Sequence, residues 1–245
     1  MATKATDVDV NLFQIGRLED SGTVSSQKIA WINHDTNKRK LHIQTPAFVT
    51  ETYGIPRQGQ YYQTDRSRAF FKLPFCHARA LCSEEMDYCA MEKFYLKLVE
   101  IDSYFGSEDF KVKLFGDKMA GKYEYQPIVR HPERGNDEEE EVTDKSSTKA
   151  VKDYYRPPYT KVKLMLSNSE TELPLFRLTD KKNDGTKEEI PLNSFSDATV
   201  HMRYMTKHRM IIEVQKLYAM KTTSGGEKRK YGITVKLVAA ECTNR

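Results

Sequence analysis

The residues best suited to chemistry in this 245-residue chain are aromatic and basic side chains that are mixed along two stretches. Single-stranded nucleic acid needs rings on which bases stack, each worth roughly 1–3 kcal/mol, and cations that hold phosphates. Residues 53–72 and 203–209 offer both kinds of group, and Trp31 is the only tryptophan. The residues predicted to bind nucleic acid, including three bases from other segments, are Trp31, Tyr53, Arg57, Tyr62, Arg66, Arg68, Phe71, Lys72, Arg130, Lys163, Arg203, Tyr204 and Lys236.

The distribution of charge also favours a polyanionic ligand. The net charge is +4, but the segment from Glu133 to Asp144 contributes −6 because it holds seven acids and one base, so the remainder carries +10. A basic surface of this kind favours phosphate backbones. The alternative is that strands prefer aromatic residues in any protein and that most of these rings belong to the core. That alternative is stronger for any single ring, whereas the set as a whole favours binding.

The acidic run Asp137–Glu141 lies within a loop predicted over residues 132–153, where Pro, Gly, Asn and Ser accompany the charges. It could imitate nucleic acid, compete for the protein's own basic face, or recruit a basic partner. The simpler interpretation is a mobile, solvated insertion, and the composition favours it.

Signatures of catalysis and of bound metal are absent or weak. The chain has no GxxxxGK[ST], GxGxxG, HExxH or GxSxG motif, so it is predicted not to be an enzyme and to need no cofactor. Cys76, His77, Cys82 and Cys89 are ligand types for zinc, but gaps of five and six residues between the cysteines match no common finger. The sequence therefore favours no metal site, and Cys89 fits the core.

Short strands must position these side chains, most clearly between Arg156 and Glu241. The last strand has an apolar set and a more polar set, which are Tyr231, Ile233, Val235, Leu237 and Ala239 against Gly232, Thr234, Lys236 and Val238. The segment Ala198–Tyr204 alternates in the same way and is also predicted as a strand. A period of two places these sets on opposite faces, so we expect a sheet with one apolar face and one basic, aromatic face.

The remaining elements are predicted from turn residues and hydrophobic spacing. One long helix is expected over residues 83–105, because Ser83 can cap it and apolar residues recur at spacings of three and four. Hairpin turns are expected at Asn183–Gly185 and Ser224–Gly226. Further strands are predicted at Asn11–Ile15, Gln27–Asn33, Lys40–Thr45, Ala47–Arg57, Ala69–Phe75, Lys111–Leu114 and Lys122–Arg130. Residues 1–9 are predicted to form a disordered arm and residues 10–245 a single domain.

Export and membrane insertion are not indicated. No segment approaches the roughly 20 apolar residues of a membrane span, and the first ten residues lack the apolar centre of a signal peptide. Four cysteines without framework spacing indicate reduced thiols. We therefore expect an intracellular protein with no membrane partner.

Four segments support a more specific expectation: LHIQTPAFVTETYGI (Leu41–Ile55), YEYQPIVR (Tyr123–Arg130), RPPYTKVKL (Arg156–Leu164) and KYGITVKLVAAE (Lys230–Glu241). Together they resemble the OB-fold single-stranded-DNA-binding proteins of large nucleocytoplasmic DNA viruses, distant relatives of the single-strand binding protein of short-tailed coliphages. They occur in the order that this family shows, with a helix between the first and the second.

The resemblance implies a mainly β fold, an OB-like five-stranded barrel with one long helix inserted and extra N-terminal strands. It implies sequence-independent binding of single-stranded DNA in viral replication, recombination or repair, in the host cytoplasm or nucleus or in the virion. RNA, replication proteins and self-association stay open as partners. The alternative is a non-enzymatic structural or virion-associated protein that uses the same fold for protein contacts.

The chain departs from the family in two places. Val235 stands where the family has an aromatic residue, and the chain ends in ECTNR without the acidic, aromatic-tipped tail of the coliphage relative. Recruitment of a polymerase through such a tail is therefore not implied.

Overall fold

The computed structural model describes residues 2–34, 39–50, 54–75, 85–132, 157–168, 172–182, 184–223 and 226–243. Its strands are β1 (Thr3–Lys4), β2 (Phe13–Ile15), β3 (Glu19–Asp20), β4 (Gln27–His34), β5 (Leu41–Gln44), β6 (Phe48–Val49), β7 (Phe70–Pro74), β8 (Tyr123–Gln126), β9 (Val129–Arg130), β10 (Tyr159–Lys163), β11 (Arg177–Lys181), β12 (Lys187–Ile190), β13 (Lys207–Met220) and β14 (Arg229–Thr243). Its helices are α1 (Glu85–Gly106), α2 (Glu108–Phe115), α3 (Asp117–Ala120) and α4 (Phe195–His201), with short 3-10 turns at Ala5–Asp7 and Val10–Leu12. The protein is mainly β, as predicted.

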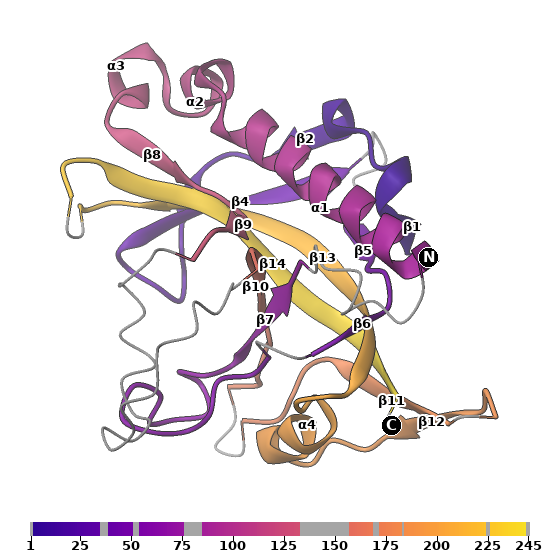
Figure 1. Cartoon of the computed structure of the whole chain (residues 1–245). Coiled ribbons are helices and arrows are strands. Elements are labelled where there is room, and N and C mark those ends of the chain that lie inside the picture. Colours follow the sequence, from indigo (N-terminus) through magenta and orange to yellow (C-terminus); the bar gives the residue numbers. More distant parts are fainter. Residues whose placement is uncertain are drawn as a thin grey trace, which may run out of the picture.

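Two long antiparallel strands, β13 and β14, form the centre of the sheet (Figure 1). The other edge of β13 pairs in turn with β4, β5 and β6. The other edge of β14 pairs in parallel with β8, β10 and β11, and β7 lies antiparallel beyond β10. The central spatial order is β5-β13-β14-β10-β7, so strands far apart in sequence lie side by side.

Two register shifts change which side chains of this hairpin reach the core. Gln215 in β13 and Val238 in β14 have no residue opposite them, which is the mark of a β-bulge. The predicted apolar face of β14 is buried at alternate positions over 231–237. Beyond the bulge Ala240 is buried in place of the predicted Ala239, because one extra residue reverses the alternation.

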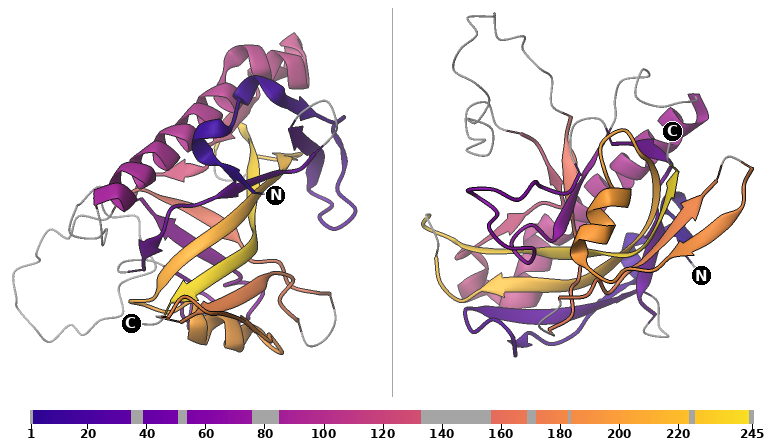
Figure 2. Two further views of the ribbon diagram at one scale, coloured as in Figure 1. Left: turned by 90° about the vertical axis from the view of Figure 1, so that its right-hand side faces the viewer. Right: turned by 90° about the horizontal axis from the view of Figure 1, so that it is seen from below.

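Helix α1 lies across one face of the sheet and supplies much of the core (Figure 2). Spacings of three and four place Phe94, Leu98, Ile101 and Phe105 on one side, and none of the four has exposed surface. Burial of each such side chain stabilises the fold by about 1.5–3 kcal/mol. The Tyr231 hydroxyl also donates to the Phe105 carbonyl at 2.7 Å, which joins the last turn of the helix to β14.

Asp102 joins α1 to the turn between β8 and β9. One of its carboxylate oxygens accepts from the Ile128 N–H at 2.7 Å and from the Tyr125 hydroxyl at 2.8 Å, and the other accepts from the Val129 N–H at 2.9 Å. Burial raises the pKa of Asp102, although these three donors act to lower it. The helix therefore positions the short strand that carries Arg130.

The long helix and most of the strands are confirmed. The helix predicted over 83–105 is α1, which ends at Gly106, and the strands predicted at Gln27–Asn33, Lys40–Thr45 and Ala69–Phe75 are β4, β5 and β7. The strands on either side of each predicted hairpin turn are antiparallel neighbours, β11 with β12 and β13 with β14.

Two predicted strands are helices instead. Ala198–Tyr204 lies largely in α4, where the Ser194 hydroxyl accepts from the Asp197 N–H at 3.2 Å and the Asp197 carboxylate accepts from the Ser194 N–H at 2.9 Å. This capping box satisfies the first amides of a helix, and it outweighs the alternating pattern. Lys111–Leu114 belongs to α2, which Ser107 caps by accepting from the Phe110 N–H at 3.2 Å.

The N-terminal segment is packed, so the prediction of a disordered arm is wrong for residues 2–9. β1 pairs in parallel with β5, and Ala5 and Val8 are buried. Lys97 of α1 donates to the Val8 carbonyl at 2.9 Å. Two small apolar side chains and one hydrogen bond therefore hold the segment against the helix.

Some predictions concern segments outside the described residues. They are the acidic loop, of which only residue 132 is described, and the possible metal ligands Cys76, His77 and Cys82.

Candidate nucleic-acid interface

The face of the sheet opposite α1, named the outer face, carries a row of residues in register, four of them polar and one aromatic. The row crosses five strands at His42 on β5, Glu213 on β13, Lys236 on β14, Lys163 on β10 and Phe70 on β7. Directly opposed residues have Cβ atoms about 4.5–5.5 Å apart, so neighbouring charges in the row interact. The fold therefore brings two predicted cations together with a carboxylate that no sequence pattern indicated.

Glu213 positions one of these cations. Its Oε2 lies 3.1 Å from His42 Nε2 and 3.3 Å from Lys236 Nζ. The Glu213 side chain is only 4% exposed, so these partners take the place of water. Lys236 is thus held in place with part of its charge neutralised, and an unpaired lysine would bind phosphate more strongly.

Lys163 and Lys216, named the lysine pair, are two neighbouring lysines without a carboxylate partner among the described residues. Desolvation lowers the pKa of Lys216, and the nearby charge of Lys163 lowers it further. Neither lysine makes an ion pair with a residue in the described part of the chain. An anion between two like charges relieves their repulsion, so this lysine pair is well suited to a phosphate.

Trp31 stands beside the lysine pair. It lies opposite Lys216 in register, and Lys216 Nζ is 5.8 Å from the centroid of the indole ring. Its neighbours Ala30 and Ile32 are buried, so the alternation of β4 turns Trp31 outward, where it is 50% exposed. A large ring with free surface beside cations is the arrangement that base stacking requires.

Strands β7 and β10 add further cations and rings to the outer face. Lys161 is in register with Lys72, and Lys161 Nζ lies 3.6 Å from the centroid of the Phe70 ring. Lys72 Nζ lies 5.4 Å from the Tyr159 ring, and Tyr159 is in register with Arg130. The predicted residues that the fold gathers on or beside this face are Trp31, Tyr62, which packs on Phe70, Lys72, Arg130, Lys163 and Lys236.

The three predicted arginines before β7 have different surroundings. Arg57 is exposed. Arg66 pairs with Glu172, with 2.8 Å between Nε and Oε1. Arg68 is only 8% exposed and pairs with Asp65 at 2.7 Å, so it holds the loop together and is not available to a ligand.

The other predicted residues are buried, distant or undescribed. Phe71 is fully buried and packs against His208, because the alternation of β7 directs it toward the core. It offers no ring face to a base, and its prediction as a stacking residue is wrong. Arg203 and Tyr204 are exposed in the turn between α4 and β13, at the end of β13 away from the lysine pair. Tyr53 lies outside the described residues.

Sequence reasoning missed two lysines that complete the site, Lys161 and Lys216. The signal for Lys161 was present, since it alternates with the predicted Lys163 on the same strand. Lys216 follows the bulge at Gln215, which reverses the alternation of β13, and no periodic rule identifies it.

The chain is similar in sequence to a viral protein. No protein-family model matches the chain. The chain is similar to "Uncharacterized protein R505" of Acanthamoeba polyphaga mimivirus, with 28% identity in an alignment 240 positions long, which covers 87% of this chain and 55% of the mimivirus protein. It thus spans about half the length of that relative.

The described residues form neither a membrane-spanning helix nor a group of metal ligands. No described helix combines the length and apolar character needed to cross a bilayer. Among the same residues, no three His, Cys, Asp or Glu side chains are grouped so that they could hold a metal ion.

Proposed function

We propose that the outer face binds single-stranded DNA without sequence preference. The observation that carries this proposal is the half-exposed Trp31 beside Lys163 and Lys216, two mutually repelling lysines that lack ion-pair partners among the described residues. A ring stacks on any base and a cation holds any phosphate, so this combination favours binding that is independent of sequence.

An OB-like barrel is part of the proposal. The proposed barrel has five strands, which in chain order are β5, β7, β10, β13 and β14. Their order in space is β5-β13-β14-β10-β7, that is, the first, fourth, fifth, third and second strands of the barrel. The third and fifth strands are parallel and the other neighbours antiparallel. This order supports a Greek-key barrel that is open between its first two strands. Oligonucleotides bind OB barrels on the second and third strands, which here carry Lys72, Lys161 and Lys163.

The proposed setting is viral DNA replication, recombination or repair, without catalysis. The similarity to a mimivirus protein supports a viral origin. The resemblance of four sequence segments to viral single-stranded-DNA-binding proteins supports the same setting.

Fluorescence titration tests the proposal, because Trp31 is the only tryptophan of the chain. Addition of an oligo-dT strand at low salt should quench its emission. The logarithm of the binding constant should fall with the logarithm of salt concentration, with a slope of roughly −0.7 for each phosphate contacted. Absence of binding at low salt, or binding that salt does not weaken, would overturn the proposal. Stable self-assembly without strand binding would favour the structural-protein alternative.

Neutralisation of the lysine pair locates the site. Lys163→Gln with Lys216→Gln should make the salt slope shallower by roughly 1.4, because two phosphate contacts are lost. The matched control is Lys113→Gln with Lys118→Gln, two exposed lysines on α2 and α3 beyond the end of α1 (Figure 1). An equal effect of both double variants would mean that only overall charge matters.

A further inference from the structure

A second group of cations lies at the far end of the central hairpin, where β11 and β12 extend the sheet (Figure 1). β11 pairs in parallel with the end of β14, and β12 pairs with β11. Neither strand is one of the five strands of the proposed barrel. The four cations gathered around the Glu241 carboxylate, named the distal cluster, are Lys181, Lys187, Lys207 and Arg209.

Glu241 organises the distal cluster without neutralising it. Its Oε1 lies 3.9 Å from Lys181 Nζ, and its Oε2 lies 2.5 Å from Lys187 Nζ. The antiparallel register places Arg209 directly opposite Glu241. The register Glu241–Thr179–Glu189 places a second carboxylate on this face, so two carboxylates face Lys181, Lys187 and Arg209, and these three cations keep a surplus of one positive charge.

A cavity of about 230 Å³ opens at the distal cluster. One water molecule takes roughly 30 Å³ of liquid volume, so the cavity has room for a phosphate group together with water. The side chains that carry charge at its wall are Lys181, Lys182, Lys207, Arg209 and Glu241. Lys182 pairs with Glu188 at 2.9 Å, whereas Arg209 has no ion-pair partner in the described part of the chain.

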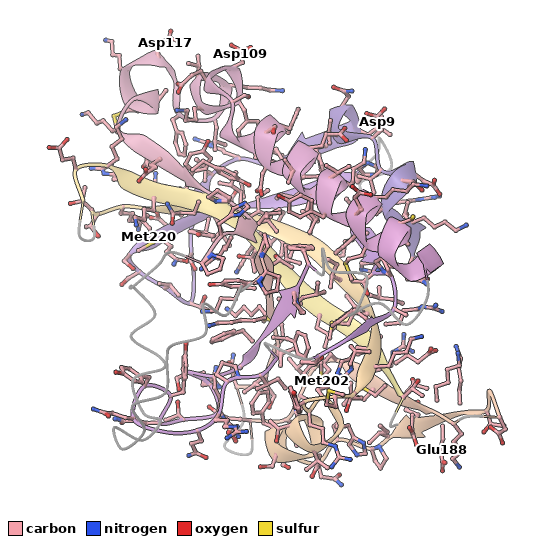
Figure 3. All side chains as sticks on the ribbon, in the orientation of Figure 1. Asp9, Asp109, Asp117, Glu188, Met202 and Met220 are labelled. Carbon is pink, nitrogen blue, oxygen red and sulfur yellow. The ribbon has the colours of Figure 1, made fainter. Side chains whose placement is uncertain are left out.

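The distal cluster and the lysine pair share one face of β13. Alternate residues of β13 over 208–214 are buried, so Lys207 and Arg209 point to the outer face, and the bulge at Gln215 keeps Lys216 on that face. The seven-residue step from Arg209 to Lys216 spans about 20–25 Å along the strand. In Figure 3 the label Met220 marks the end of β13 nearer to Lys216, and the label Glu188 marks β12 beside the distal cluster.

We propose that the distal cluster is a second phosphate-binding site for the same single strand, so that bound DNA runs along the outer face of β13 from Trp31 to Arg209. This inference rests on the proposed function and extends it to a surface that β11 and β12, which are not barrel strands, form together with the ends of β13 and β14. A short DNA strand occupies only the site formed by Trp31, Lys163 and Lys216, named the Trp31 site. A longer strand reaches both sites, and the second contact then forms within the complex at high effective concentration.

Oligonucleotides of two lengths test the second site. We compare oligo-dT of about five nucleotides, near the lower end of the site sizes of single OB folds, with oligo-dT of about twenty, which exceeds the upper end. Arg209→Gln with Lys181→Gln should weaken binding of the long strand at least tenfold and make its salt slope shallower by roughly 1.4. Binding of the short strand, followed by Trp31 fluorescence, should be unchanged. Lys113→Gln with Lys118→Gln is again the control.

Glu241→Gln provides a test of opposite sign. Removal of this carboxylate frees the surrounding cations, so the long strand should bind several-fold more tightly while the short strand is unaffected. A damaged fold would not produce tighter binding of one length only.

The outcomes separate this inference from the proposed function. If the Arg209→Gln, Lys181→Gln variant binds the long strand as tightly as the control does, or loses affinity equally for both lengths, the distal site is overturned while the Trp31 site stands. If the wild-type protein binds neither oligonucleotide, the proposed function is wrong, and so is the proposed path of DNA along β13.

Discussion

Trp31 combines two properties that are separate elsewhere in the described chain: a large exposed ring and a direct lysine neighbour. We predict that Trp31→Ala weakens oligo-dT binding by about 5- to 150-fold, the equivalent of 1–3 kcal/mol for one stacked base. Trp31→Phe should recover much of that loss, because a smaller ring still stacks. Anisotropy of a labelled strand measures both.

The control for this prediction is Leu96→Ala, which removes an exposed apolar side chain from α1. An equal loss of affinity in the Leu96 variant would show that the effect of Trp31 is not one of stacking.

His208 is a buried base on the core side of β13. No described residue makes a hydrogen bond of good geometry with its two ring nitrogens, and the rings of Phe48 and Phe71 lie 5.7 and 5.6 Å away. Burial lowers its pKa from 6.5 to about 4. Between these two pH values the unfolded chain binds a proton that the folded chain excludes, so folded-state stability is complete above pH 6.5 and declines toward pH 4. The expected loss is about 3 kcal/mol.

Denaturant unfolding at several pH values checks this expectation. His208→Leu removes the titrating group, so its free energy of unfolding should fall less between pH 6.5 and pH 4 than that of the wild type. Parallel curves for the two proteins would contradict the assignment of the acid sensitivity to His208.

At the scale of elements, one carboxylate holds a helix to a strand turn. Asp102→Asn replaces one acceptor oxygen by an NH₂ group, which would face the N–H of Ile128 or of Val129. A buried donor without an acceptor costs about 1–3 kcal/mol, and we expect a loss of stability of that size in denaturant unfolding. Glu92→Gln, an exposed change on the same helix, is the control and should have little effect.

The elements also show where sequence reasoning succeeds and fails. The helix α1 could be predicted because its apolar spacing is regular over 22 residues. Alternation identified β4, β5 and β7, but it failed for Ala198–Tyr204, where the Ser194 capping box decides the conformation. It also failed beyond Leu237, since a bulge depends on how β14 pairs with its neighbours.

At the scale of the whole molecule, the site could be predicted only in part. Lys163 and Lys236 were identified by alternation, and the fold places them in one row. The sequence could not show that Glu213 neutralises part of that row, because the two partners of its carboxylate lie on different strands. Nor could it show that Arg68 is buried, since the Asp65 pairing is a property of the folded loop.

The central position of β14 has a consequence for the order of events during synthesis. β8, β10, β11 and β13 all pair with β14, and the register joins Tyr123 to Arg229 across more than a hundred residues. None of these four pairings can form before residues 229–243 have left the ribosome. These upstream strands are therefore all made before the strand that joins them, and β8, β10 and β11 reach β14 through contacts of long sequence separation, the kind that fold slowly.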